Sequence, residues 1–336
     1  MAAYTTINDP ESYFKAVLYT GNETADTSIT TGFDTDFTWI KVRETAGTAN
    51  HSQVDSVRGV TKVIHSNLSI AEETISNAVT AFTSTGFTLG DDSGGYGFNE
   101  DGKAYVCWNW KESATAGFDI VSYTGNGSAR TISHSLSAVP HLMIFKNRDD
   151  AQAWSVYHHK NTSAPATDRL ILNTTEATYD DSIDFNDTDP TSSVFSVGTG
   201  NRTNMDGDNL IAYLFSEKQG FSKFGVFTGN GNADGPFCFC GFKPAFIIIK
   251  KSSATGPWIV FDNKRPFQTS DFEKPRLVAN ATGTDTSSFL GLDFLANGFK
   301  LRETDTDVNG SGVTYLFIAF AESPLVNSEE VPNNAQ

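Results

Sequence analysis

The most constraining feature of this sequence is a short phrase that occurs three times at one interval. An aromatic residue followed by Thr-Gly-Asn occupies 19–22, 123–126 and 227–230, so successive copies start 104 residues apart. A second phrase, Asn-x-x-Gly, keeps a step of 105 residues and begins at Asn99, Asn204 and Asn309. Two independent phrases that share one period predict three tandem copies of one structural unit.

Further columns repeat between these phrases. Each copy has an apolar run that ends in lysine, an asparagine that closes a short apolar stretch, and an apolar octet that ends in glutamate. The columns are Lys41, Lys146 and Lys250; Asn67, Asn173 and Asn280; and Glu112, Glu217 and Glu322. A catalytic residue is needed only once, so a residue that is present in every copy is expected to be architectural.

The repeat length sets the expected domains. Each copy has the usual size of one domain and is longer than the unit of a solenoid. We expect three domains, each with its own core, at 1–115 (with a short N-terminal lead before residue 11), 116–218 and 219–326, followed by a polar tail, 327–336. The joints are short and lack long Gly/Ser runs, which predicts a semi-rigid rod or a compact stack.

The apolar runs alternate as strands do. In the third octet Leu316, Ile318 and Phe320 point one way while their neighbours, also apolar, point the other way, which indicates a strand covered on both sides. Gly and Asn beside these runs favour tight turns. The segment 69–82 carries a capping-box pattern and is expected to form one or two helical turns. The sequence predicts an all-β fold of three tandem antiparallel β-sandwich domains, of jelly-roll or lectin-like type.

Charge limits the partners of this chain. The formal net charge is −16, whereas nucleic-acid binding needs clustered Lys and Arg, and anionic lipid repels an acidic surface. No apolar stretch approaches the ~20 residues of a membrane span. The N-terminus lacks the basic and apolar regions of a signal peptide. We therefore expect no nucleic-acid partner, no membrane insertion, and assembly in the cytoplasm.

Motifs of enzymes and metal sites are missing from the sequence. The histidines show no His-x-x-x-His spacing, and neither Gly-x-Ser-x-Gly nor a phosphate loop occurs. Cys107, Cys238 and Cys240 form no metal or disulfide pattern. We expect no enzymatic activity, no catalytic residue, no cofactor and no metal. The segment 305–310, Asp-x-Asp-x-Asn-Gly, matches the first half of a calcium loop but has Leu316 at its twelfth position, so we favour a turn over an ion site.

An Asp-x-x-Arg motif occurs in two copies, as Asp55 with Arg58 and Asp262 with Arg265, while the middle copy has His158 and no arginine. The guanidinium of Arg58 or Arg265 could hold a ligand carboxylate or a sugar hydroxyl. The alternative, which we favour, is an ion pair within the domain that fixes a loop.

Aromatic residues in the variable loops are candidates for stacking on sugar rings. They are Tyr96, Phe98, Tyr157 and Tyr179. The same residues are also ordinary anchors of loops, and the sequence does not rank the two interpretations.

Several segments resemble a group of structural proteins from bacteriophages that infect marine bacteria, including cyanobacteria. The similar segments are Tyr4–Pro10, Asp55–Gly59, Gly86–Leu89, Tyr105–Lys111, Phe118–Gly127 and Phe224–Gly231. The resemblance covers essentially the whole chain and implies a tail-fibre-like virion protein without catalytic residues. Many members of the group carry long low-complexity inserts between copies; this chain lacks them, which favours a compact adhesin over a long fibre.

This resemblance implies a function in the virion. It favours a receptor-binding tail-fibre subunit that is located in the virion, contacts other virion proteins, and presents loops to a host glycan or surface protein. By analogy the subunit forms a homo-oligomer, such as a trimer, whose weak contacts add up to avidity. One alternative is a capsid decoration or neck-and-tail protein that binds only other virion proteins, and a minor one is a glycan depolymerase.

Overall fold

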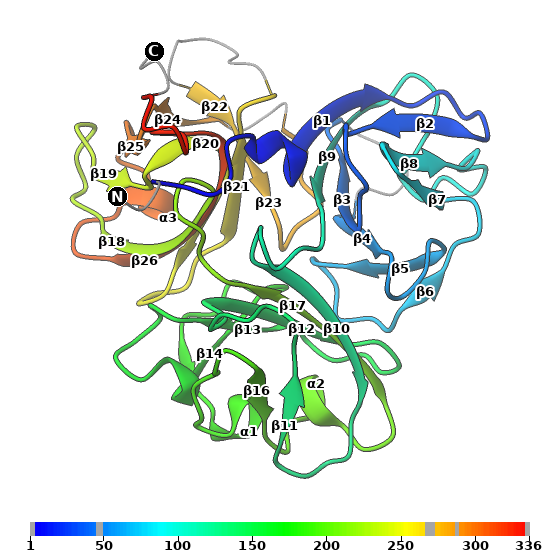
Figure 1. The fold of residues 1–336 in the computed structure, drawn as a ribbon, viewed down its shortest axis with the longest axis horizontal. Helices are drawn as coiled ribbons and strands as arrows, with labels where there is room; N and C mark the ends of the chain where they lie inside the picture. Colours follow the sequence, from blue (N-terminus) through cyan, green and yellow to red (C-terminus); the bar gives the residue numbers. More distant parts are fainter. Residues whose placement is uncertain (1–3, 45–49, 266–272, 286–288, 333–336) are drawn as a thin grey trace.

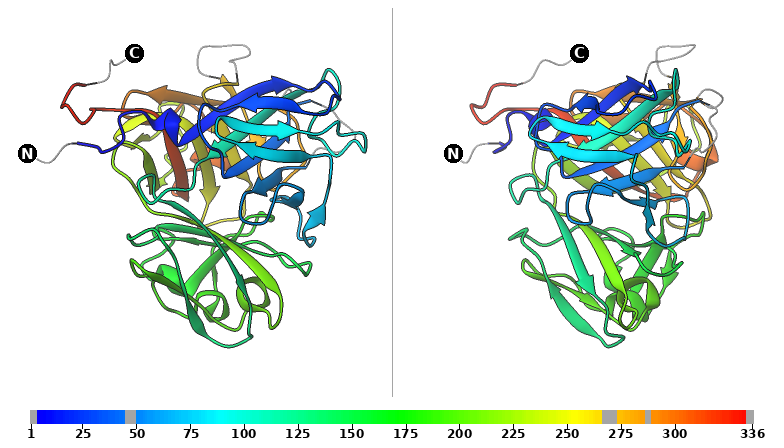
Figure 2. Two further views of the ribbon diagram at one scale, coloured as in Figure 1. Left: turned by 45° about the vertical axis from the view of Figure 1, so that its right-hand side comes forward. Right: turned by 90° about the vertical axis from the view of Figure 1, so that its right-hand side faces the viewer.

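The computed structural model describes residues 4–44, 50–265, 273–285 and 289–332. The chain is an all-β protein built from antiparallel sheets, as the sequence predicts. Figure 1 shows three β-rich units around a common centre, coloured blue to cyan, green, and yellow to red, and each unit corresponds to one sequence repeat. From the side, the second unit lies below the other two (Figure 2).

The first repeat consists of a large and a small antiparallel sheet. The large sheet has the order β1-β9-β3-β4-β5-β6 and the small one β2-β8-β7. A 3-10 turn, η1 (Pro10–Ser12), precedes them. The strands are β1 (Phe14–Thr20), β2 (Thr27–Thr30), β3 (Phe37–Val42), β4 (Ser52–Asp55), β5 (Lys62–His65), β6 (Glu73–Thr74), β7 (Val79–Thr83), β8 (Gly86–Leu89) and β9 (Ala104–Trp110).

The second repeat uses the same strand order, β10-β17-β12-β13-β14-β15, with the small sheet β11-β16. The short helix α1 stands at the place of β7, before the strand β16 that corresponds to β8. The elements are β10 (Phe118–Thr124), β11 (Arg130–Ser133), β12 (Leu142–Asn147), β13 (Ser155–His158), η2 (Pro165–Thr167), β14 (Asp168–Ile171), β15 (Tyr179–Asp180), α1 (Ser182–Phe185), β16 (Val194–Val197), α2 (Asn201–Asn204) and β17 (Asn209–Phe215).

The third repeat again pairs its first strand with its last, in the order β18-β26-β20-β21-β23, and its small sheet is β19-β25-β24-β22. Its elements are β18 (Ser222–Thr228), β19 (Phe237–Phe239), β20 (Phe242–Lys251), β21 (Trp258–Asp262), β22 (Glu273–Pro275), β23 (Leu277–Val278), β24 (Phe289–Leu295), β25 (Gly298–Leu301), α3 (Thr306–Asn309) and β26 (Thr314–Pro324). The three thirds of the chain therefore share one strand order.

The two repeated phrases contact each other. In the first repeat the buried amide of Asn99 accepts a hydrogen bond from the backbone N–H of Asn22 (3.0 Å) and donates one to the carbonyl oxygen of Gly90 (2.8 Å). The equivalent bonds are Asn126 N–H to Asn204 at 3.1 Å and Asn230 N–H to Asn309 at 2.9 Å. Both phrases keep one period because each asparagine ties the turn after the first strand to the turn before the last.

The expected helix at 69–82 is wrong. This segment contains β6 and β7 instead, and Glu72 bonds the second repeat through its backbone N–H and the carbonyl oxygen of Arg148 (2.7 Å). Sheet pairing and this contact override the local capping-box signal, because a single helical turn gains little without tertiary packing.

Each repeat has a core between its two sheets, but a fourth and larger core lies where the three large sheets meet. At its centre Trp110, Phe215 and Phe320, which are equivalent residues of the three last strands, form a triangle. Their ring centroids are 6.5, 5.6 and 5.5 Å apart for the pairs 110–215, 215–320 and 110–320. The expectation of a rod or stack of beads is therefore replaced by a closed triangular block with a shared core.

The described residues include no helix that is long and apolar enough to cross a membrane. Cys107, Cys238 and Cys240 are buried and free.

Candidate functional site

The Asp55–Arg58 pair lies at the joint between the first and second repeats. Both side chains are fully buried, and Nε of Arg58 donates to Oδ2 of Asp55 at 2.5 Å. The second repeat supplies Tyr213, whose hydroxyl donates to the same carboxylate oxygen at 2.6 Å. Because Arg58 and Tyr213 both bond the Asp55 carboxylate, no room is left there for a ligand. We call this buried Asp–Arg pair, together with its donor from the neighbouring repeat, a latch, because it joins the two repeats.

Asp262 and Arg265 form the equivalent latch between the third and first repeats. Nε of Arg265 donates to Oδ2 of Asp262 at 2.6 Å, and the indole N–H of Trp108 in the first repeat donates to that oxygen at 3.1 Å. Burial by itself would raise the pKa of Asp262, but the charge and hydrogen bonds of Arg265, helped by Trp108, hold it below its usual value. Arg58 and Arg265 are thus inaccessible as ligand-binding residues.

The joint between the second and third repeats uses histidine. Nε2 of His158 lies 3.4 Å from the carbonyl oxygen of Phe317, and Nε2 of His159 lies 2.7 Å from that of Phe224. Burial, and then the charge of His159, lowers the pKa of His158 to about 3. The third repeat has Ile318 where the other two have Trp108 and Tyr213. An aspartate is therefore present only where the facing repeat offers a side-chain donor.

Other contacts follow the same cyclic order. The indole N–H of Trp154 donates to the carbonyl oxygens of His65 and Leu68 in the first repeat, each at 3.0 Å, and that of Trp258 donates to Ile171 in the second at 2.9 Å. The second and third repeats thus contact the preceding repeat with the same surface. Head-to-tail contacts of this kind close into a ring when the rotation per unit allows it.

The repeated lysines also serve the joints. Nζ of Lys146 donates to the carbonyl oxygen of Ser69 in the first repeat at 3.1 Å. Lys41 and Lys250 reach Thr282 and Thr175 of their preceding repeats, each at 3.4 Å. Burial lowers their pKa values to about 8 for Lys41 and Lys146 and to about 7 for Lys250. Their repetition therefore has a structural cause.

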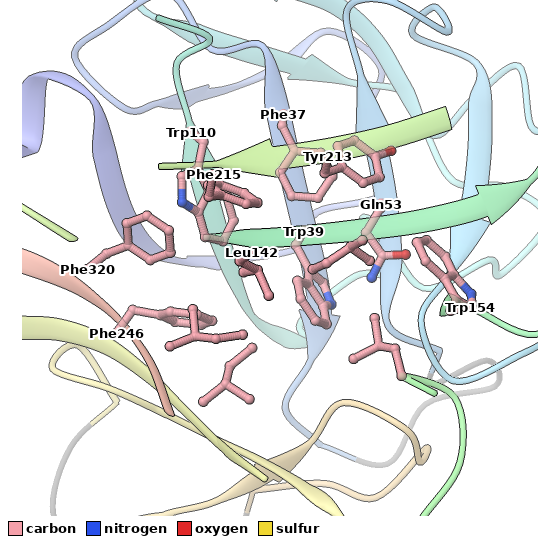
Figure 3. A pocket seen from close by; sticks show the side chains of 14 residues that line it. Phe37, Trp39, Gln53, Trp110, Leu142, Trp154, Tyr213, Phe215, Phe246 and Phe320 are labelled. Carbon is pink, nitrogen blue, oxygen red and sulfur yellow. The ribbon is translucent and has the colours of Figure 1, made fainter. Parts of the chain in front are cut away.

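The shared core encloses a small cavity of about 40 Å³ (Figure 3). Aromatic rings from all three repeats line it, and Figure 3 shows the amide of Gln53 among Trp39, Trp154 and Tyr213. Gln53 is buried, and neither of its amide atoms has a hydrogen-bond partner among the described residues. The volume admits only a few water molecules, so this cavity is too small for an organic ligand.

Two of the four candidate sugar-stacking residues are buried. Phe98 lies in the first sandwich core and Tyr157 in the second, with exposed fractions of 0% and 3%. The expectation that their rings face solvent is wrong, because each closes a core between two sheets. Tyr96 and Tyr179 are exposed at 41% and 59%, in loops or edges of the first and second repeats. The guanidinium of Arg169 lies 4.9 Å from the ring centroid of Tyr179.

Both aspartates of the segment 305–310, which resembles a calcium loop, bond other groups of the protein. Asp305 caps the turn α3 by accepting a hydrogen bond from the N–H of Asp307 at 2.7 Å, and Asp307 pairs with Lys251 at 3.2 Å and Arg276 at 3.4 Å. In the part of the chain that the structure describes, no three His, Cys, Asp or Glu residues gather as metal ligands do.

A paired-carboxylate cluster in the second repeat is likewise neutralised by cations. Asp184 is buried and accepts from Arg202 at 2.9 Å and from the hydroxyl of Ser155 at 2.7 Å, while Asp181 pairs with Arg169 and, at 2.6 Å, with Arg202. The two arginines hold both carboxylates within the second repeat, although burial still raises the pKa of Asp184 above its usual value.

Sequence reasoning did not identify the partners of the latches, Trp108 and Tyr213. One signal was present: the aspartate column and the fourth position of the octet (Trp108, Tyr213 and Ile318) change together between copies. Residues that change together between copies are expected to be in contact. Only the closed ring explains why the two residues that meet belong to different copies.

One family model matches residues 9–324, which is nearly the whole chain and includes all three repeats. None of the curated proteins compared with the chain matches it. The match treats the three repeats as one unit, in agreement with their shared core. The chain belongs to the family DUF7483, a domain of unknown function.

Proposed function

We propose that this protein is a structural component of a bacteriophage particle and acts as a receptor-binding, tail-fibre-type subunit. The resemblance of its repeated segments to marine phage structural proteins supports the virion assignment. The single observation that best supports a binding role is the closed block itself. Its repeated polar residues are used in joints and turns, which leaves the peripheral loops of three rigidly connected sandwiches as the variable surface.

Rigid display suits multivalent adhesion. A shared core fixes the three sets of loops relative to one another, so that loop contacts with a host surface form without much further loss of conformational freedom. Tyr96 and Tyr179, in the first and second repeats, keep exposed ring surface for sugar stacking. That the chain forms a homo-oligomer, such as a trimer, stays a prediction. Sedimentation of the purified chain measures the number of subunits.

A second candidate function is a capsid decoration or neck-and-tail protein that binds only other virion proteins. One observation favours it: the exposed phenylalanines of β19, Phe237 and Phe239, form an apolar edge in one repeat alone. Such an edge fits a protein partner better than a glycan.

Infection assays separate the two candidates. A receptor-binding protein added in excess binds host cells and blocks infection by the phage that encodes it. The double substitution Tyr96→Ala with Tyr179→Ala lowers cell binding about tenfold or more, as expected when two stacking contacts are lost. Val139→Ala removes an exposed apolar side chain elsewhere and serves as the matched control.

Failure of the wild-type protein to bind cells or block infection contradicts the receptor-binding role. Mass spectrometry of purified particles then decides on the virion assignment. A copy number that matches capsid symmetry supports the decoration protein, and absence from the particle contradicts both candidates. Release of reducing ends from host polysaccharide would instead identify a depolymerase.

A further inference from the structure

Strand β19 differs from its two counterparts at its exposed positions. Ile29, Ile132 and Cys238 are equivalent, because each pairs with a phenylalanine of the neighbouring strand in the same small sheet. The flanking positions are Ser28 and Thr30 in the first repeat, Thr131 and Ser133 in the second, and Phe237 and Phe239 in the third. At these two positions the first and second repeats have Ser or Thr, whereas the third repeat has phenylalanines that are exposed at 45% and 56%.

The same strand has an unpaired backbone edge. Among the residues that the structure describes, β19 pairs with β25 alone. The N–H of Cys240 donates to Asn297 (2.9 Å) and the carbonyl of Pro236 accepts from Leu301 (3.1 Å), so the even-numbered residues of β19 form the hydrogen-bonded pairs. Phe237 and Phe239 therefore direct their N–H and C=O groups away from β25. An apolar edge strand with free backbone groups is a template for another strand.

A hollow of about 290 Å³ adjoins this edge, between β19 and the edge strand β18 of the large sheet. Gly225 leaves room for the hollow because it has no side chain. The first and second repeats have Val17 and Val121 at the equivalent position. A Cβ atom on Gly225 would lie 2.3 Å from the ring of Phe317. Figure 1 places β18 and β19 at the outer edge of the third unit, and Lys160 of the second repeat also lines the hollow.

Two lysines, Lys160 and Lys223, lie at this hollow. On a chain with a net charge of −16, Lys160 is an exposed cation at the rim of this depression. Lys223 pairs with Glu217 at 2.8 Å, while Lys160 is exposed. The rim therefore favours a partner that carries a carboxylate beside its apolar side chains.

We infer that β19 and the adjoining hollow bind an extended segment of a partner protein, which adds a strand to the small sheet of the third repeat. The residue opposite Cys238 places its side chain in the hollow, next to Gly225 and Phe317. The residues on either side of it pack beside Phe237 and Phe239, and a flanking acid pairs with Lys160. Main-chain hydrogen bonds supply affinity and the hollow supplies selectivity.

A second copy of this chain is the less suitable occupant. Strand β19 has three residues and is about 10 Å long, whereas a stable dimer buries about 800 Å² on each partner. A short extended segment needs no such area.

A synthetic peptide tests this inference on the full-length protein. The probe has valine at alternate positions, threonine between them, and aspartate at both ends. Its control has the same side chains but carries N-methyl groups on the amides of one edge, which removes strand pairing alone. We expect the probe to bind the wild type, and both the N-methylated peptide and the double variant Phe237→Thr with Phe239→Ser to reduce binding about tenfold or more.

The double variant places in β19 the residues that the second repeat has at Thr131 and Ser133, so the strand is expected to fold unchanged. Val139→Thr, an exposed valine of the second repeat, is the control for loss of surface apolarity. Equal binding by the double variant, or no binding of the probe to the wild type at about 1 mM, overturns the inference. Self-association of the wild type that the double variant abolishes would identify a second copy as the occupant and would also overturn it.

This inference goes beyond the proposed receptor-binding function, because it assigns an attachment site and the chemistry of its ligand. The peptide assay and the infection assay use separate surfaces, so either can fail without the other.

Discussion

Single hydrogen bonds at the joints are the most informative features at the scale of residues. Asp55 and Asp262 are buried carboxylates that depend on donors from another repeat. A buried acceptor that loses one donor suffers much of the desolvation penalty of the group, whereas an exposed one is compensated by water. The latches are therefore sensitive to changes that barely alter volume.

Tyr213→Phe removes only the hydroxyl that donates to Asp55. We expect the free energy of unfolding to fall by about 1–3 kcal/mol, because the carboxylate stays buried with fewer donors. Urea denaturation measures the change, and Tyr96→Phe at an exposed position is the control, with an effect within about 0.5 kcal/mol. A loss as small as the control's would show that the hydroxyl does not stabilise the joint.

His158 makes the joint of the second and third repeats dependent on pH. Its pKa is about 3 when folded, below the ordinary value of 6.5, so the unfolded chain binds the proton more tightly. Its contribution to stability is complete above pH 6.5 and is lost as the pH falls toward 3. The titratable groups that act on it are His159, Glu217 and His141, and Lys160 and Lys223 in turn act on His141.

We therefore expect His158→Gln to make stability less steeply dependent on pH between 6 and 4.5, by about 1.4 kcal/mol per pH unit, which corresponds to one proton. Denaturation at several pH values gives the slope, whatever the variant's stability at neutral pH. His134→Gln, at the surface of the second repeat, controls for loss of a histidine. An unchanged slope for His158→Gln would contradict the burial of an uncharged imidazole at this joint.

At the scale of elements, the turn that follows the first strand of each repeat approaches the turn before its last strand too closely for a side chain. A Cβ atom on Gly21, Gly125 or Gly229 would lie 2.2, 1.9 or 2.3 Å from a backbone carbonyl oxygen of that turn. The glycine of the Thr-Gly-Asn phrase is thus required by the contact that Asn99, Asn204 and Asn309 make. This contact fixes the turn after the first strand against the turn before the last strand in every repeat.

Gly125→Ala is expected to lower the free energy of unfolding by about 2 kcal/mol or more, because the backbone of one turn must move. The matched control is Gly283→Ala, where a Cβ atom meets nothing within 4 Å. Thermal unfolding of the two variants measures the difference. Similar unfolding temperatures would mean that the turns adjust freely.

At the scale of the whole molecule, the shared core couples the three sandwiches. Each large sheet is apolar on its inner face and on the face toward its own small sheet, and Trp110, Phe215 and Phe320 meet at the centre. A repeat removed from the ring would expose this face. The ring is therefore expected to unfold as one cooperative unit.

Phe215→Ala is expected to destabilise the protein by about 3–5 kcal/mol while leaving a single transition, since its ring contacts both other repeats. Hydrogen exchange then shows lost protection in all three repeats.

The isolated segment 116–218 supplies the complementary measurement. We expect it to lack a cooperative transition and to bind an apolar dye, because Ile120, Leu142 and Tyr213 lose their cover. A sharp transition for this segment would mean that the repeats are independent domains after all.

The sequence alone determined the number of repeats, the β class, the two apolar faces of the octets and the turn glycines. These features depend on spacing and alternation, which are properties of the local backbone. In the third octet the predicted faces are confirmed: Leu316, Ile318 and Phe320 lie in the shared core, and Tyr315, Phe317 and Ala319 lie in the sandwich core.

Only the tertiary structure decided what covers each face and which residues meet. The partners Asp55 and Tyr213 lie 158 residues apart, and Trp108 and Asp262 lie 154 apart, with no local signal that joins them. Burial of Phe98 and Tyr157 and the strands within 69–82 were equally set by long-range packing. Alternation shows that a strand is covered on both sides, but whether a small sheet or another repeat covers it depends on how three units close into a ring.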